Sequence, residues 1–171
     1  MNKQIFRAVA ILAALLAMTA CSQAPQGDAP AAAGNVDTET PEYAAMEYRQ
    51  GLMHVIAFKA GQVRGMASGD IPVDEALFVK SARDLAAAAA MLDEAFVAGS
   101  DSVSMPGSNA LPDIWSDWDA FQERKTNLQT VTAAVAAQAQ AGGFQAAQAT
   151  AAEDIGPACG GCHRPYRQSV D

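Results

Sequence analysis

The sequence predicts an all-α protein built as an antiparallel four-helix bundle, and two observations support this fold class. Alanine runs supply much of the 50% apolar content, while aromatic residues make up only 6%. Such a small-residue composition suits closely packed helices better than a β-sandwich. Glycine and proline then divide residues 41–171 into four long stretches with helical periodicity. Because most of the connections are short, successive helices should be antiparallel.

The first two predicted helices cover residues 41–68 and 73–98. Thr40 is placed to cap the first helix, and Pro41 occupies the favoured first helical position. Residues 69–72 contain a glycine and a proline and separate the two helices, and Gly99 ends the second. Apolar side chains recur at helical spacing in both stretches, which gives each helix one face for the core.

The third and fourth predicted helices cover residues 114–141 and 144–168, after a long loop at residues 100–113. The pair Gly142-Gly143 separates them, and Gly156-Pro157 is expected to interrupt the fourth. Pro165 should also bend the fourth helix, since it lacks the N–H that would bond to the carbonyl of Gly161.

The first 20 residues have the pattern of a signal peptide, with Lys3 and Arg7 before the apolar run 8–17. Cys21 follows small residues at the end of this run, which resembles a bacterial lipoprotein signal in which that cysteine is acylated. Ordinary cleavage near Cys21 without a lipid is the alternative. Residues 21–40, rich in Ala, Pro, Gly and Gln, are predicted to be a flexible linker. We therefore expect a periplasmic protein anchored to a membrane at Cys21.

Charge and cysteine content exclude several classes of protein. Eleven Lys and Arg against 19 Asp and Glu give a net charge of -8, so the basic surface that nucleic-acid binding needs is absent. Three cysteines cannot form the disulfide framework of a small secreted scaffold. No nucleophile–base pair or pair of carboxylates suggests an enzyme.

The sequence Cys159-Gly160-Gly161-Cys162-His163 is the signature of covalent haem attachment. In that chemistry the two thiols add across the vinyl groups of the porphyrin, and the histidine becomes the proximal ligand of the iron. A dithiol oxidoreductase would need a βαβ context, which this helical chain lacks. A zinc site would need four ligands, and only His54 and Cys21 are available outside the motif.

Three motifs resemble those of the cytochrome c′ family, which includes low-spin relatives. Residues 48–53 resemble the Tyr-Arg motif of the family's first helix, and residues 114–117, followed by Phe121, resemble the Ile-Trp motif of its third. Residues 156–167 resemble the family's terminal stretch with its two cysteines, histidine, tyrosine and arginine. The resemblance implies a four-helix bundle with one haem between the first and last helices, and a role in electron transfer or nitric oxide binding.

The same resemblance implies roles for three further residues. Arg49 matches a residue near the haem propionates, Met53 matches the residue over the distal side of the iron, and Arg167 matches a basic residue beside the proximal histidine. His54 points about 100° around the helix from Met53 and is predicted to be partly exposed rather than a ligand. Trp115 and Trp118 are predicted to pack at a helix start.

Three functions follow as hypotheses. The first is an exported mono-haem c-type cytochrome with five-coordinate iron at His163, which transfers electrons, binds nitric oxide or does both. The second is a low-spin electron carrier in which Met53 is the sixth ligand. The third is a haem-free helical lipoprotein that acts as an interaction module. The redox partner is not identified by the sequence, and the resemblance implies a homodimer that pairs through the first two helices.

Overall fold

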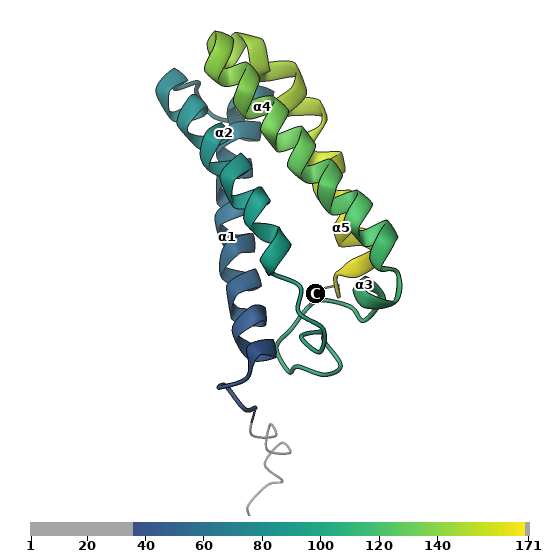
Figure 1. The fold of residues 1–171 in the computed structure, drawn as a ribbon. Coiled ribbons are helices and arrows are strands. Elements are labelled where there is room, and N and C mark those ends of the chain that lie inside the picture. The colour runs from purple at the N-terminus through teal and green to yellow at the C-terminus, as the bar shows by residue number, and fades with distance from the viewer. Residues whose placement is uncertain (1–35, 170–171) are drawn as a thin grey trace, which may run out of the picture. The chain divides into compact units, whose positions relative to one another are not determined.

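The computed structural model describes residues 36–169, which form a bundle of four long helical segments (Figure 1). The predicted signal peptide, Cys21 and most of the predicted linker lie outside the described residues. Among residues 36–169, no helix is long and apolar enough to cross a membrane. The elements, in chain order, are α1 (Pro41–Ser68), α2 (Glu75–Ala90), the 3₁₀ helix η1 (Met91–Glu94), α3 (Asp113–Ser116), α4 (Trp118–Glu153) and α5 (Ile155–Tyr166).

The bundle runs up, down, up and down through α1, α2, the first part of α4, and the segment from Phe144 to the end of α5 (Figure 1). The last reversal occurs inside α4, where Gly143 has φ 67° and ψ -157°. This conformation is open essentially to glycine alone. The backbone N–H of Phe144 then donates to Oε1 of Glu75 at 2.7 Å, which fixes the start of the fourth segment against α2. The predicted division at Gly142-Gly143 is confirmed.

Helix α1 has the predicted bounds. The Thr40 hydroxyl accepts a hydrogen bond from the backbone N–H of Tyr43 at 3.2 Å and so caps the first turn. Gly69 ends the helix in the left-handed conformation, with φ 83°.

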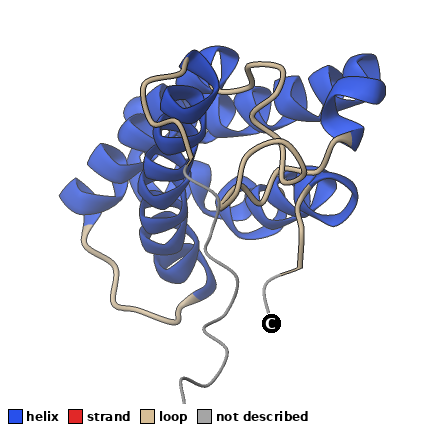
Figure 2. Cartoon of the chain, turned by 90° about the horizontal axis from the view of Figure 1, so that it is seen from below, coloured by secondary structure: helices blue, strands red, loops and turns tan. Residues whose placement is uncertain are grey.

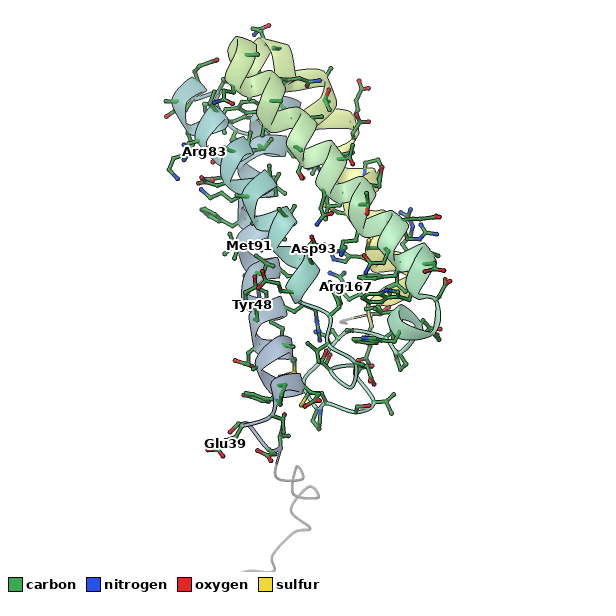
Figure 3. All side chains as sticks on the ribbon, viewed as in Figure 1. Glu39, Tyr48, Arg83, Met91, Asp93 and Arg167 are labelled. Carbon is green, nitrogen blue, oxygen red and sulfur yellow. The ribbon has the colours of Figure 1, made fainter. Side chains whose placement is uncertain are left out.

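The second helix is shorter than the predicted 73–98, since α2 ends at Ala90 and continues only as η1. Three side chains from neighbouring helices donate to backbone carbonyl groups at this end: Gln129 to Ala89 at 3.2 Å, Tyr48 to Met91 at 3.4 Å and Arg49 to Ala95 at 2.9 Å. Figure 3 shows Tyr48 beside Met91. These contacts satisfy carbonyl groups that have no helical partner where the α-helix ends.

The fourth segment also differs from the prediction at two points. The interruption lies at Asp154, before Gly156, because Pro157 is the third residue of α5, where its missing N–H has no helical partner to lose. The helix ends at Tyr166 rather than at residue 168, one residue after Pro165. Arg167 is extended, with φ -120° and ψ 133°, and forms an isolated antiparallel bridge with Ala110.

The main core fills the space among α1, α2 and the two halves of the α4–α5 hairpin. Phe78 and Phe144 meet edge to face with their ring centroids 5.0 Å apart. Close packing joins α1 to α2, α2 to α4, and α4 to α5, whereas a cavity lies between α1 and α5. Figure 2 shows the bundle from the end at which the long loop and the described C-terminal residues lie.

Candidate haem-binding site

A cavity of about 650 Å³ opens between α1 and α5, and a smaller cavity of about 40 Å³ adjoins it. The volume of the larger cavity is within the range of roughly 300–1,000 Å³ that cofactor sites occupy, and such sites occur between the helices of bundles. One side is a face of α1, the opposite side is α5, and residues of the loop before α3 close one end. Helices α1 and α5 are therefore separated by the cavity, whereas the other neighbouring helix pairs pack directly against each other.

Helix α5 presents Cys159, Cys162 and His163 to this cavity. Spacings of three and four residues place these side chains on one face of the helix. Both cysteines are half-buried free thiols. Burial raises the pKa of each thiol, although the positive charges of Arg64 and Arg124 act in the opposite direction on Cys159 and Cys162 respectively. Both groups are therefore neutral thiols at pH 7.

His163 is half-buried, and two effects favour its neutral form. Burial is the larger effect that lowers the pKa of its imidazole, and the positive charge of Arg167 lowers it further. The neutral imidazole is the form that ligates a metal. Arg167 lies outside the helix, which was predicted to run to residue 168, but its backbone N–H donates to the carbonyl oxygen of His163 at 3.2 Å.

Met53 approaches the same space from α1. Its side chain is half-buried and lines both cavities together with His163. His54 is exposed and lines only the larger cavity. A thioether and an imidazole from two helices thus border one space.

Arg49 is buried and directs its guanidinium to the loop before α3. Nη1 donates to the carbonyl oxygen of Ala95 at 2.9 Å and to the hydroxyl of Ser100 at 2.8 Å. Nη2 donates to the carbonyl oxygen of Ser100 at 2.7 Å and to the hydroxyl of Ser108 at 3.0 Å. Desolvation lowers the pKa of Arg49 to about 10, partly opposed by the charge of Asp101. The side chain lines the cavity while it holds the loop in place.

The lining fits a planar apolar group that carries carboxylates. Side chains such as Ile56, Phe96 and Phe121 give the cavity apolar walls. The loop end carries the cations Arg49 and Arg167, and among the described residues no aspartate or glutamate lines either cavity. Haem has this character, and the two thiols of α5 are the groups that its vinyl substituents require.

Sequence reasoning missed Lys125, which lines the smaller cavity together with Cys162 and His163. Lys125 is buried, at 7% exposure, and donates to Oδ1 of Asp93 on η1. A signal was present in the sequence, because Lys125 follows Phe121 by four residues and precedes Leu128 by three, on the apolar face of the third helix. A lysine at such a position buries its ammonium group, which then needs a hydrogen-bond acceptor or an opposite charge.

The two tryptophans lie outside the cavity lining. Trp115 packs against the small cluster of Ala110, Ile114, Phe121 and Tyr166. The ring of Trp118 lies 5.7 Å from that of Phe121, and 39% of the residue is exposed. These positions agree with the predicted packing role at a helix start.

Comparison with known proteins identifies the family. The family model described as Cytochrome C' matches residues 44–167. Cytochrome c-554 of Cereibacter sphaeroides is 38% identical over 124 residues, which are 72% of this chain and 80% of the relative. The solved structure of cytochrome c prime from Shewanella frigidimarina has a TM-score of 0.68 at 33% identity and covers 75% of this chain and 97% of that one.

A second solved structure is a variant of cytochrome c prime from Alcaligenes xylosoxidans in complex with nitric oxide. It has a TM-score of 0.66 at 28% identity and covers 75% of this chain and 97% of that one. An all-α bundle whose last helix presents a Cys-x-x-Cys-His motif to a cavity fits a c-type haem protein. The chain belongs to the cytochrome c′ family.

Membership of this family confirms the four-helix bundle and the covalently attached c-type haem with its iron. The haem-free alternative is thereby set aside. All six residues predicted to bind the cofactor, namely Arg49, Met53, Cys159, Cys162, His163 and Arg167, line one cavity. Their individual roles stay predictions.

Proposed function

We propose that this c-type cytochrome transfers electrons and binds nitric oxide, or another small gas, at a five-coordinate iron. In this proposal Cys159 and Cys162 form the thioethers, His163 is the proximal ligand and Met53 covers the distal side. The observation that supports it is the convergence of these four side chains on one cavity. When bound, the haem supplies the one-electron chemistry and the ligand site, while the chain positions it and limits access to it.

Two comparisons test the cofactor assignment in cells that carry out haem attachment. Acidified acetone should leave haem on the wild-type chain, and Cys159→Ser with Cys162→Ser should allow its complete extraction. His163→Gln should remove the native haem spectrum, whereas His54→Gln, at the other histidine lining the cavity, should preserve it. Extraction of all haem from the wild-type protein would contradict the assignment.

Binding of nitric oxide is supported by the solved complex of the Alcaligenes xylosoxidans variant. Addition of nitric oxide to the reduced protein should change its absorption spectrum at about one equivalent of gas. A low-spin electron carrier is the second candidate function, because the Met53 thioether borders the same space as His163. In that case the gas would bind only slowly, after displacement of the thioether.

The location of the protein is part of the proposal. The haem-attachment motif and the signal pattern of residues 1–20 support export to the periplasm, with Cys21 as the acylated N-terminus. Two or more acyl chains give stable membrane anchoring, so Cys21→Ser should release the protein from the membrane fraction or block its processing. An intact mass that matches a mature chain beginning after residue 21 would contradict acylation. Pairing of two copies through the first two helices is proposed on the family resemblance and can be checked by sedimentation.

A further inference from the structure

Three exposed arginines from three different helices lie next to α5 at the segment that holds the cysteines, and one of them, Arg64, also lines the larger cavity. Arg64 comes from α1, Arg124 from α4 and Arg164 from α5 itself. We call these three residues the arginine patch. Each guanidinium lies next to a glycine of α5, and these glycines are Gly156, Gly161 and Gly160 respectively. The guanidinium of Arg124 also donates to the carbonyl oxygen of Gly161 at 3.2 Å.

The arginine patch adds three positive charges to the surface of an acidic protein. The net charge of the chain is -8. Within residues 36–169, every ion pair involves Asp84 or Asp93, and none includes a residue of the patch. The field of the patch reaches the cofactor-binding residues, because Arg64 acts on the Cys159 thiol and Arg124 on the Cys162 thiol.

The arginine patch lies far from the end of the cavity at which the haem propionates are expected, so it is not placed to form ion pairs with them. In the porphyrin, the vinyl and propionate substituents project from opposite edges. Because the vinyl groups would bind Cys159 and Cys162, the propionates would project from the opposite edge of the ring. Arg49, at the loop end of the cavity, is fifteen residues before Arg64 on α1, which is about 22 Å along the helix. The arginine patch is therefore not needed for the propionates.

We propose that the arginine patch is the docking surface for an acidic electron-transfer protein. This inference rests on haem attachment at Cys159 and Cys162. Net negative charge repels an acidic partner from most of the molecule, so a local positive patch would orient it during encounter. The guanidinium groups lie against the glycines of α5, so they are the charged groups that such a partner would meet at this helix. On docking, one electron passes from the reduced partner to the ferric iron, which leaves the partner oxidised and the iron ferrous.

A binding experiment on the haem-loaded protein tests the patch with fluorescent poly-L-glutamate as a model acidic polypeptide. Fluorescence anisotropy at low ionic strength should show binding that is at least tenfold weaker for the triple variant Arg64→Gln, Arg124→Gln, Arg164→Gln. The control replaces Lys59, Lys80 and Arg83 by glutamine, which makes the same charge change around Asp84. Figure 3 shows Arg83 on α2, far from α5. Equal weakening in both variants would overturn the proposal.

Reduction kinetics give the second test. The ferrous EDTA complex, a small anion, should reduce the wild-type protein at a rate that falls as ionic strength rises. In the triple variant the low-salt rate should fall about tenfold and should rise with ionic strength. If haem attachment fails, the haem spectrum will be missing. If the spectrum is normal but the reduction rates are the same in both proteins, the docking proposal is wrong and the haem assignment stands. If the patch binds phosphatidylglycerol vesicles but does not bind poly-L-glutamate, the proposal of an acidic protein partner is wrong, and the patch binds an anionic membrane instead.

Discussion

Arg49 of α1 donates hydrogen bonds to both the hydroxyl and the carbonyl oxygen of Ser100, at 2.8 and 2.7 Å. This double contact joins the helix that carries Met53 to the loop that closes one end of the cavity. Because each of its four Nη–H bonds has an acceptor in the loop, the guanidinium offers only Nε–H to a haem propionate. Arg49 therefore acts first on the loop, and any contact with a propionate is added to that role.

Arg49→Ala should destabilise the haem-loaded protein by about 2–4 kcal/mol, because it leaves buried hydroxyl and carbonyl groups without their charged donor. Chemical denaturation measures this loss, and amide hydrogen exchange should show faster exchange in residues 95–108. Gln50→Ala is the control, since Gln50 makes a single exposed hydrogen bond to Gly107 of the same loop. Equal effects of the two substitutions would show that Arg49 does not hold the loop.

Local signals in the sequence were sufficient for much of the fold and the site. The cap at Thr40 and the pair Gly142-Gly143 act through neighbouring residues, so the start of α1 and the last reversal could be predicted. The end of α2 depends on side chains of α1 and α4 that bond to its carbonyl groups, and such long-range contacts leave no local pattern. The helical spacing of Lys125 was a local signal for its burial, but its contact with Asp93 is long-range and leaves no local pattern.

Gly143→Ala should destabilise the bundle by about 1–3 kcal/mol, because the backbone there adopts a conformation that only glycine reaches without strain. A Cβ atom would also collide with the Glu75 carboxylate, which accepts from the backbone N–H of Phe144. Thermal and chemical denaturation measure the change. Gly51→Ala, in the exposed middle of α1 with open space around it, should instead stabilise by about 0.5–1 kcal/mol. A stable Gly143→Ala protein would contradict the assigned reversal.

The charges of Lys125 and Asp93 should have opposite effects on the reduction potential of the haem iron, so neutralising each of them should shift the potential in opposite directions. Lys125 lines the smaller cavity together with His163, so its positive charge disfavours the more positive ferric iron. Lys125→Gln should therefore lower the midpoint potential by tens of millivolts, since about 1 kcal/mol corresponds to about 40 mV in a one-electron couple. Asp93→Asn removes the opposing charge and should raise it. Redox titration followed by absorption measures both, and shifts of the same sign would contradict an electrostatic origin.

Met53 decides which of the two haem functions the protein has, and two substitutions separate them. Met53→Leu removes the sulfur and nearly keeps the volume, whereas Met53→Ala removes both. If the thioether only covers the distal side, wild type and Met53→Leu should share a five-coordinate spectrum. Met53→Ala should then keep that spin state and admit larger ligands, such as alkyl isocyanides, because steric access to the iron increases.

The low-spin alternative gives the opposite pattern with the same proteins. If the Met53 sulfur binds the iron, the wild-type protein should show a low-spin spectrum with the far-red band of methionine-ligated ferric haem. Met53→Leu and Met53→Ala should both lose that band. Both should also have a lower reduction potential, because a thioether ligand favours ferrous iron. We expect the five-coordinate pattern, in which Met53→Leu matches wild type, and loss of a low-spin spectrum in Met53→Leu would make the protein a dedicated electron carrier.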